Sequence, residues 1–137
     1  IDGCPHTGPS LCSNKAGLMS LWYTEGSGTG IYYAQMSEND NKFSPRQLVS
    51  SNGHHPQLCA NGDRIAMLWE ENIENNGEPK TVIHYRILTG EVQVENNALT
   101  PQKVNAFLPV VTHTKGGFLT AYLLERNNHV GVYITRL

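Results

Sequence analysis

The chain repeats itself, and this repeat restricts the possible folds more than any other feature of the sequence. Three segments align without gaps: 17–25 (GLMSLWYTE), 64–72 (RIAMLWEEN) and 117–125 (GFLTAYLLE). One aromatic position recurs in the alignment at intervals of about 50 residues, and it is occupied by Trp22, Trp69 and Tyr122. A period of this length is typical of propellers and other repeat folds, in which each copy is one supersecondary unit.

The same alignment explains the placement of two cysteines. The phrases PSLC (9–12) and PQLC (56–59) precede the first two copies of the segment in the same frame. The chain has 3 cysteines, and an odd number cannot all pair within one chain. We therefore predict that Cys12 and Cys59 are small buried side chains and not parts of a disulfide framework.

Each copy continues with short stretches that are rich in Val, Ile, Tyr and Leu and are bounded by Gly, Asn, Pro and Ser. This pattern is typical of strands joined by hairpins, and Asn-Gly pairs at 52–53, 61–62 and 76–77 mark turns. After the tryptophan strand, the predicted third strands are 31–36, 82–88 and 130–137. The predicted fourth strands are 43–49 and 99–105, and the third copy has none.

These elements predict an all-β fold of three four-stranded β-propeller blades, the last lacking its outer strand. The expected boundaries are about 4–49 for blade 1, about 54–105 for blade 2 and about 107–137 for blade 3. Propellers have roughly four to eight blades, so three cannot close a ring, and the open flanks would expose apolar surface. We therefore expect either the C-terminal half of a larger propeller or one half of a homodimeric ring.

Composition narrows the range of partners. Hydrophobic residues make up 39% of the chain, charged residues make up 16%, and the net charge is −2. This balance is unlike the basic surface of a nucleic-acid-binding protein. No apolar run approaches the roughly 18 to 20 residues needed for a membrane span.

The order of elements in residues 30–71 resembles that of the sialidase-like, BNR/Asp-box propeller family. In that family a strand leads into a turn of the form Ser-x-Asp-x-Gly-x-x-Trp/Phe, and an outer strand follows. The turn SENDNKF shares Ser37 and Phe43 with this box, but it is one residue shorter, and Asn39 and Asn41 replace Asp and Gly. The phrase CPHTGPSL at the start is also similar to an opening found in bacterial sialidase-like proteins. The resemblance implies a secreted or periplasmic protein.

Sialidases of this family hold the sugar carboxylate with three arginines and use a tyrosine, a glutamate and an aspartate in catalysis. None of the arginines of this chain lies in a motif that transfers such a role: Arg46, Arg64, Arg86, Arg126 and Arg136. We therefore expect a non-catalytic module that binds a glycan, a protein or a metal at the channel mouth. The alternative is part of an exo-sialidase-like glycoside hydrolase whose site is completed by other blades.

A candidate metal site lies just before the first strands of two blades. Cys4 and His6 precede Pro9, while His54 and His55 precede Pro56. Equivalent positions of adjacent blades converge around the channel of a propeller, and thiolate with imidazole suits Zn or Cu. The alternative is that His55 caps a strand entry and His54 is a solvated loop residue.

The aromatic position of the repeat has two interpretations. A row of exposed rings could stack on sugars, whereas buried rings would pack between blades. Their shared place in the middle of the second strand favours core packing for Trp22, Trp69 and Tyr122. We expect His84, His113 and His129 to be structural or surface residues.

Overall fold

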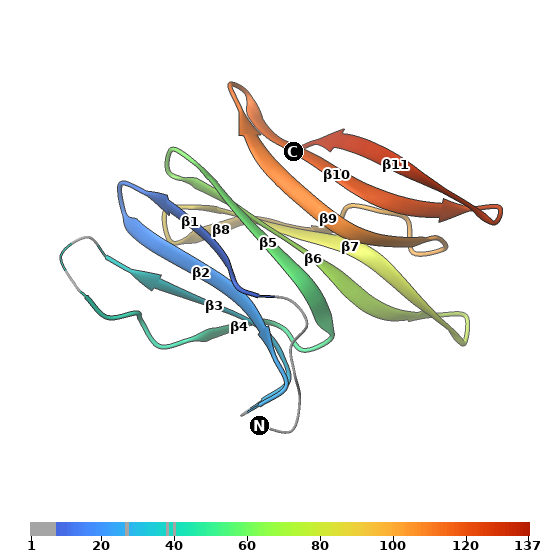
Figure 1. The fold of residues 1–137 in the computed structure, drawn as a ribbon, viewed down its shortest axis with the longest axis horizontal. Helices are drawn as coiled ribbons and strands as arrows, with labels where there is room; N and C mark the ends of the chain where they lie inside the picture. The colour runs from blue at the N-terminus through green and yellow to red at the C-terminus, as the bar shows by residue number, and fades with distance from the viewer. Residues whose placement is uncertain (1–7, 27, 38, 40) are drawn as a thin grey trace.

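A computed structural model describes residues 8–26, 28–37, 39 and 41–137 of the chain. The fold is all-β, as predicted: 72% of the described residues are in strands, and none of them is in a helix. Consequently this part of the chain has no helix long and apolar enough to cross a membrane. Figure 1 shows three antiparallel sheets that follow one another along the chain and in space.

Each sheet is a meander of consecutive strands. Sheet 1, in the order β1-β2-β3-β4, contains β1 (Ser10–Asn14), β2 (Gly17–Thr24), β3 (Gly30–Met36) and β4 (Gln47–Ser50). Sheet 2, in the order β5-β6-β7-β8, contains β5 (Gly53–Asn61), β6 (Arg64–Asn75), β7 (Glu78–Thr89) and β8 (Val92–Ala98). Sheet 3, in the order β11-β10-β9, contains β9 (Asn105–Thr114), β10 (Gly117–Arg126) and β11 (His129–Arg136).

Sheet 2 lies between the other two, and each of its faces contributes residues to a hydrophobic core (Figure 1). Successive side chains of a strand point to opposite faces, so β6 divides its apolar residues between two cores. Met67 and Trp69 face sheet 1, whereas Ala66 and Leu68 face sheet 3. The first strands of the three sheets, β1, β5 and β9, lie next to one another, and none of the sheets closes on itself.

The aromatic position follows the prediction in two copies and departs from it in one. Trp69 is 2% exposed and Tyr122 is 8% exposed, so both pack between sheets, as predicted. Trp22 is only partly buried, because it lies on the face of sheet 1 that no described sheet covers. It stacks there on Tyr32, with ring centroids 6.2 Å apart.

Asparagine side chains link neighbouring sheets at one rim. Asn14 Nδ2 donates to the carbonyl of Gly62 at 2.9 Å, and Asn61 Nδ2 donates to the carbonyls of Thr114 and Gly117 at 3.1 and 3.0 Å. Asn14 and Asn61 are equivalent in the repeat, so an equivalent donor links sheet 1 to sheet 2 and sheet 2 to sheet 3, although the acceptor carbonyls differ. The alignment therefore predicts packing between copies as well as strand order.

The turns obey the expected chemistry. Asn76 and Gly77 have φ values of 54° and 79°, as a two-residue type I′ turn between β6 and β7 requires. Gly30 has φ +139°, and a Cβ there would lie 2.3 Å from the carbonyl oxygen of Ser50. Only glycine therefore allows β3 to begin beside β4.

The predicted fourth strand of the second copy is wrong. Residues 99–105 were expected to pair with the third strand, but β8 spans Val92–Ala98 and residues 99–104 form a connection to β9. Pro101 has no N–H to donate to a ladder, whereas the segment before it can pair along the edge of β7. Thr100 is buried in the connection, where its Oγ1 accepts a hydrogen bond from the Ile83 N–H.

Candidate functional site

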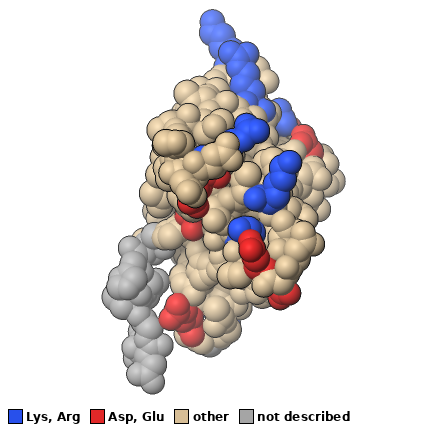
Figure 2. Space-filling view, turned by 90° about the vertical axis from the view of Figure 1, so that its right-hand side faces the viewer, with Lys and Arg blue, Asp and Glu red and all other residues tan. Residues whose placement is uncertain are grey.

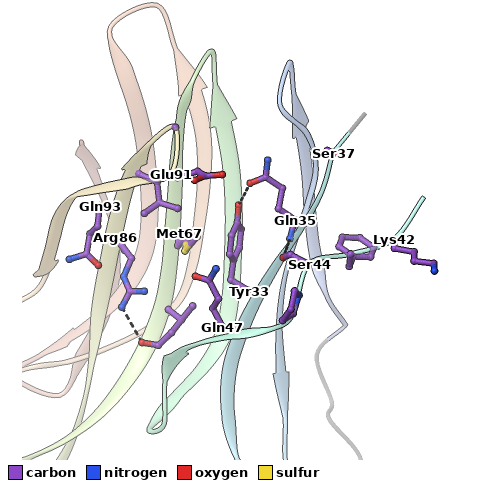
Figure 3. Close-up of a pocket in the computed structure, with 15 residues that line it drawn as sticks. Tyr33, Gln35, Ser37, Lys42, Ser44, Gln47, Met67, Arg86, Glu91 and Gln93 are labelled. Atoms are coloured by element: carbon purple, nitrogen blue, oxygen red, sulfur yellow. Dashed lines mark hydrogen bonds between the residues drawn. The ribbon is translucent and has the colours of Figure 1, made fainter. Parts of the chain in front are cut away.

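A cleft of about 760 Å³ opens between sheets 1 and 2, next to their third and fourth strands (Figure 3). Its polar lining is dominated by amide and hydroxyl groups, and an apolar floor lies below them. The polar residues include Tyr33, Gln35, Ser44, Gln47, Arg86, Glu91 and Gln93. The floor includes Val49, Met67 and Leu88.

Strand alternation aims these side chains at one another. Tyr33 and Gln35 are two apart on β3 and share the face of sheet 1 that lies against sheet 2. Arg86 lies on β7 directly opposite Met67 of β6, so both present themselves to sheet 1. These residues therefore lie on paired strands, which hold side chains more rigidly than loops do.

Hydrogen bonds fix Gln35 at one wall of the cleft. Tyr33 Oη donates to Gln35 Oε1 at 3.2 Å, and Gln35 Nε2 donates to the carbonyl of Ala16 at 3.2 Å. The backbone N–H of Gln35 donates to Ser44 Oγ at 3.1 Å. Burial, helped by Cys12 and Glu91 nearby, raises the pKa of Tyr33 to about 12, so its phenol remains a hydrogen-bonding group at neutral pH.

Arg86 forms the opposite wall. Its Nη2 donates to the carbonyl of Val49 at 3.2 Å, and its guanidinium carbon lies 5.9 Å from the centroid of the Trp69 ring. Its Nε is buried and has no hydrogen-bond partner among the described residues. Burial also lowers the pKa of Arg86. A buried donor without a partner is costly to leave unsatisfied.

A second pocket, of about 700 Å³, adjoins the cleft at the rim where the β1–β2 and β5–β6 hairpins meet. The two cavities share Gln35, Gly90 and Glu91, so Gln35 and Glu91 stand at the junction between them. This second cavity is also lined by Asn14 and Asp63. The arrangement can therefore accommodate a ligand longer than one small molecule.

The two histidines of the predicted metal site have different surroundings. His54 packs its ring against Tyr23, with centroids 4.7 Å apart. His55 Nδ1 lies 2.8 Å from Oε2 of Glu70, which is 7% exposed. Glu70 Oε1 also accepts a hydrogen bond of 2.7 Å from the Leu108 N–H, so this carboxylate ties β5 and β9 to β6.

Cys4 and His6, the other two predicted ligands, lie outside the described residues. In the part that is described, no three His, Cys, Asp or Glu side chains are grouped so that they could hold a metal ion. A Zn or Cu site at Cys4, His6, His54 and His55 therefore remains a prediction.

Cys12 and Cys59 both carry free thiols and are partly buried. Burial, with a smaller effect of Cys59, raises the pKa of the Cys12 thiol to about 12. Burial also raises the pKa of Cys59, against the effect of a hydrogen bond with the His113 backbone. Raised thiol pKa values make both cysteines poor nucleophiles and poor metal ligands at neutral pH.

Comparison of the chain with models of protein families, with curated proteins and with solved structures gave no significant match. The resemblance to the BNR/Asp-box family therefore rests on the quoted residues. Ser37, Asn39, Asn41 and Phe43 of the turn are described, whereas residues 38 and 40 are not. Phe43 is 45% exposed and lines the cleft.

Sequence reasoning did not identify the cleft residues Gln35, Gln47 and Arg86. Strand alternation could have predicted that Gln35 shares a face with Tyr33. It could not predict that Arg86, about 50 residues later, lies across the same cavity, because this depends on how two sheets pack.

Proposed function

We propose that this chain is a non-catalytic binding module that holds a glycan in the cleft between sheets 1 and 2. A side-chain amide both donates and accepts hydrogen bonds, as a sugar hydroxyl does, and Gln35, Gln47 and Gln93 supply three amides. Arg86 and Tyr33 add further donors above an apolar floor. A volume of about 760 Å³ lies within the usual range for ligand pockets, roughly 300 to 1,000 Å³.

A difference between two equivalent interfaces carries this proposal. Gln35 pairs with Met19 and Ile87 pairs with Ala66, which are equivalent in the repeat, so Gln35 and Ile87 occupy the same place in sheets 1 and 2. Ile87 is 0% exposed and closes the core between sheets 2 and 3. Of the two interfaces between sheets, the one with the cavity has the polar residue at this position, which favours a ligand site over an ordinary gap between sheets.

A second position differs in the same way between the two interfaces. Arg86 pairs with Met67 and Thr135 pairs with Thr120, and these partners are again equivalent. Arg86 therefore faces sheet 1 where the small Thr135 faces sheet 2. At the interface that holds the cleft, two positions therefore carry long polar side chains where the other interface has smaller or apolar ones.

The chemistry of the cleft favours binding over turnover. Glu91 is the one carboxylate among the cleft residues that the structure describes, whereas glycoside hydrolysis generally uses two. A tyrosine nucleophile needs an activated phenol, but the pKa of Tyr33 is raised to about 12, and its hydroxyl donates to an amide. The alternative, an exo-sialidase-like site completed by other blades, would have to supply its catalytic groups from elsewhere.

The test is binding to an array of immobilised neutral and acidic glycans, followed by calorimetry with the glycan that binds best. Gln47→Ala should weaken binding about tenfold, because one hydrogen bond contributes about 1.4 kcal/mol. Gln102→Ala removes an exposed amide outside the cleft and should leave affinity unchanged. Absence of glycan binding, or equal effects of the two variants, would overturn the proposal, and hydrolysis of a fluorogenic sialoside would favour the hydrolase.

We further propose that the three sheets are consecutive blades of a propeller. Their common strand order, their adjacent first strands and the repeated asparagine bonds support this architecture. An extracellular or periplasmic location, expected from the family resemblance, suits a protein that binds glycans. A protein or metal ligand at the channel mouth remains the other prediction for this fold.

A further inference from the structure

The outer face of sheet 3 exposes a position that the repeat buries in the other sheets. Ile31, Ile83 and Val132 pair with Tyr23, Glu70 and Leu123, which are equivalent in the alignment. Ile31 and Ile83 are 0% exposed because sheet 2 or sheet 3 covers them, whereas Val132 is 71% exposed.

Neighbouring residues of this face show the same contrast. Ile134 is 66% exposed, whereas its equivalent Tyr33 is 6% exposed. Val110 and Val130 on the same face are 54% and 58% exposed. Four exposed aliphatic side chains on one face of a chain of modest net charge favour this face as a contact surface for another protein. Figure 2 shows a side of the molecule on which scattered acidic and basic side chains, some of them next to one another, lie on a mostly uncharged surface.

The outer face of sheet 1 also exposes residues whose equivalents are buried in sheet 2. Leu11 is 56% exposed, whereas its equivalent Leu58 is 6% exposed under sheet 1. Trp22 is partly exposed where its equivalent Trp69 is 2% exposed. Within the chain, the face with Leu58 and Trp69 packs on the face with Ile31. The uncovered face of sheet 1 carries the same leucine and tryptophan as the face of sheet 2 that covers sheet 1. It therefore matches the outer face of sheet 3 in the same way.

We propose that a second copy of this chain covers both faces. The outer face of sheet 3 packs on the outer face of sheet 1 of the partner, and the partner reciprocates, so that two chains form a ring of six sheets. Both contacts continue the sheet packing seen within the chain, and six lies within the roughly four to eight blades of known propellers. The net charge of −2 per copy opposes association only weakly. This interface is distinct from the ligand cleft.

The first measurement is the mass of the 137-residue chain by light scattering over a dilution series. The expected mass is twice 15.2 kDa. Val132→Lys should raise the dissociation constant about 100-fold, because it removes a buried valine at each of two interfaces and costs about tenfold at each. Val92→Lys is the matched control: Val92 is 65% exposed on β8 of sheet 2, on neither end face, and its variant should dimerise like the wild type.

A second variant tests which faces meet. Leu11→Lys alters the outer face of sheet 1 and should also be monomeric, while circular dichroism confirms that both variants are folded. An equal mixture of Leu11→Lys and Val132→Lys retains one unaltered interface, so it should associate more tightly than either variant alone. A monomeric wild type overturns the proposal. So does a dimeric Leu11→Lys protein, because its sheet 3 would then pair with its own copy.

Discussion

Glu70 offers the sharpest test of how the sheets are held together. It is 7% exposed, and the equivalent positions in the other copies hold Tyr23 and Leu123, so a carboxylate is not a general requirement of the repeat. Its two oxygens bind the Leu108 N–H at 2.7 Å and approach His55 Nδ1 to 2.8 Å. Leu108 and His55 both have positive φ, 54° and 48°, at irregularities of β9 and β5. We infer that Glu70 stabilises two strained bends in neighbouring first strands.

The cost of Glu70→Ala follows from these contacts. A hydrogen bond to a charged group contributes about 1.5 to 3 kcal/mol, and truncation leaves the Leu108 N–H without this acceptor. The contact with His55 is an ion pair only when the imidazole is protonated, and the His55 side chain is 40% exposed, so this contact contributes about 1 kcal/mol or less. We expect the free energy of unfolding to fall by about 2 to 3 kcal/mol in total, which lowers the midpoint of thermal unfolding by roughly 5 to 10 °C.

Urea denaturation followed by tryptophan fluorescence measures this change. Glu74→Ala is the matched control, because Glu74 lies exposed on the same strand and its loss should change the free energy of unfolding by about 0.5 kcal/mol or less. Combining Glu70→Ala with His55→Ala should show a coupling energy of about 1 kcal/mol or less. Equal stabilities of the Glu70→Ala and Glu74→Ala proteins would refute the role assigned to this carboxylate.

Three further predictions concern titratable groups. Burial lowers the pKa of His84, so the unfolded chain binds a proton that the folded chain does not, and stability should fall as pH falls below about 6.5. His84→Asn should flatten this part of the stability profile measured by urea denaturation. In a Cys4→Ser background, the raised pKa values of Cys12 and Cys59 should make their labelling by a thiol reagent slow at mildly alkaline pH and fast in denaturant, and fast labelling of the folded chain would contradict this. If the predicted metal site exists, Cys4→Ser should weaken Zn binding in a chelator titration by orders of magnitude and Cys59→Ser should not, whereas equal weak binding would exclude the site.

Much of the fold could be predicted because strands and turns depend on residues close together in the sequence, and the repeat shows their pattern three times. Strand alternation and turn residues fixed the second and third strands of every copy, and the Asn-Gly pair at 76–77 forms the expected hairpin turn. The fourth strand of the second copy was placed about seven residues too late, because matching Pro101 to Pro45 outweighed the pairing capacity of 92–98. A proline can mark a strand edge or a connection, and the sequence alone does not distinguish these uses.

The candidate site was less predictable, because it depends on contacts between copies. Equivalent residues can make equivalent contacts between copies: Cys12 and Cys59 each pack against the core between their own sheet and the next. The sequence also predicted that Gln35 and Ile87 each lie on the third strand of their own copy. Only the packed structure shows that one of them borders a cavity and the other fills a core.

Exchanging these two residue types would separate folding from binding. Gln35→Ile gives sheet 1 the residue that sheet 2 uses, so it removes a cleft amide but adds apolar surface, and stability should change by about 1 kcal/mol or less. Glycan binding should nevertheless fall at least about tenfold, because hydrogen bonds to the ligand are lost and the junction of the two cavities narrows.

The reciprocal Ile87→Gln places an amide in a 0% exposed core and should lower the free energy of unfolding by about 3 kcal/mol, while the folded fraction keeps its affinity. Calorimetry measures the glycan affinity of each variant, and urea denaturation measures its free energy of unfolding. If the Gln35→Ile protein binds glycan as tightly as the wild type does, the amide of Gln35 does not contribute to ligand binding.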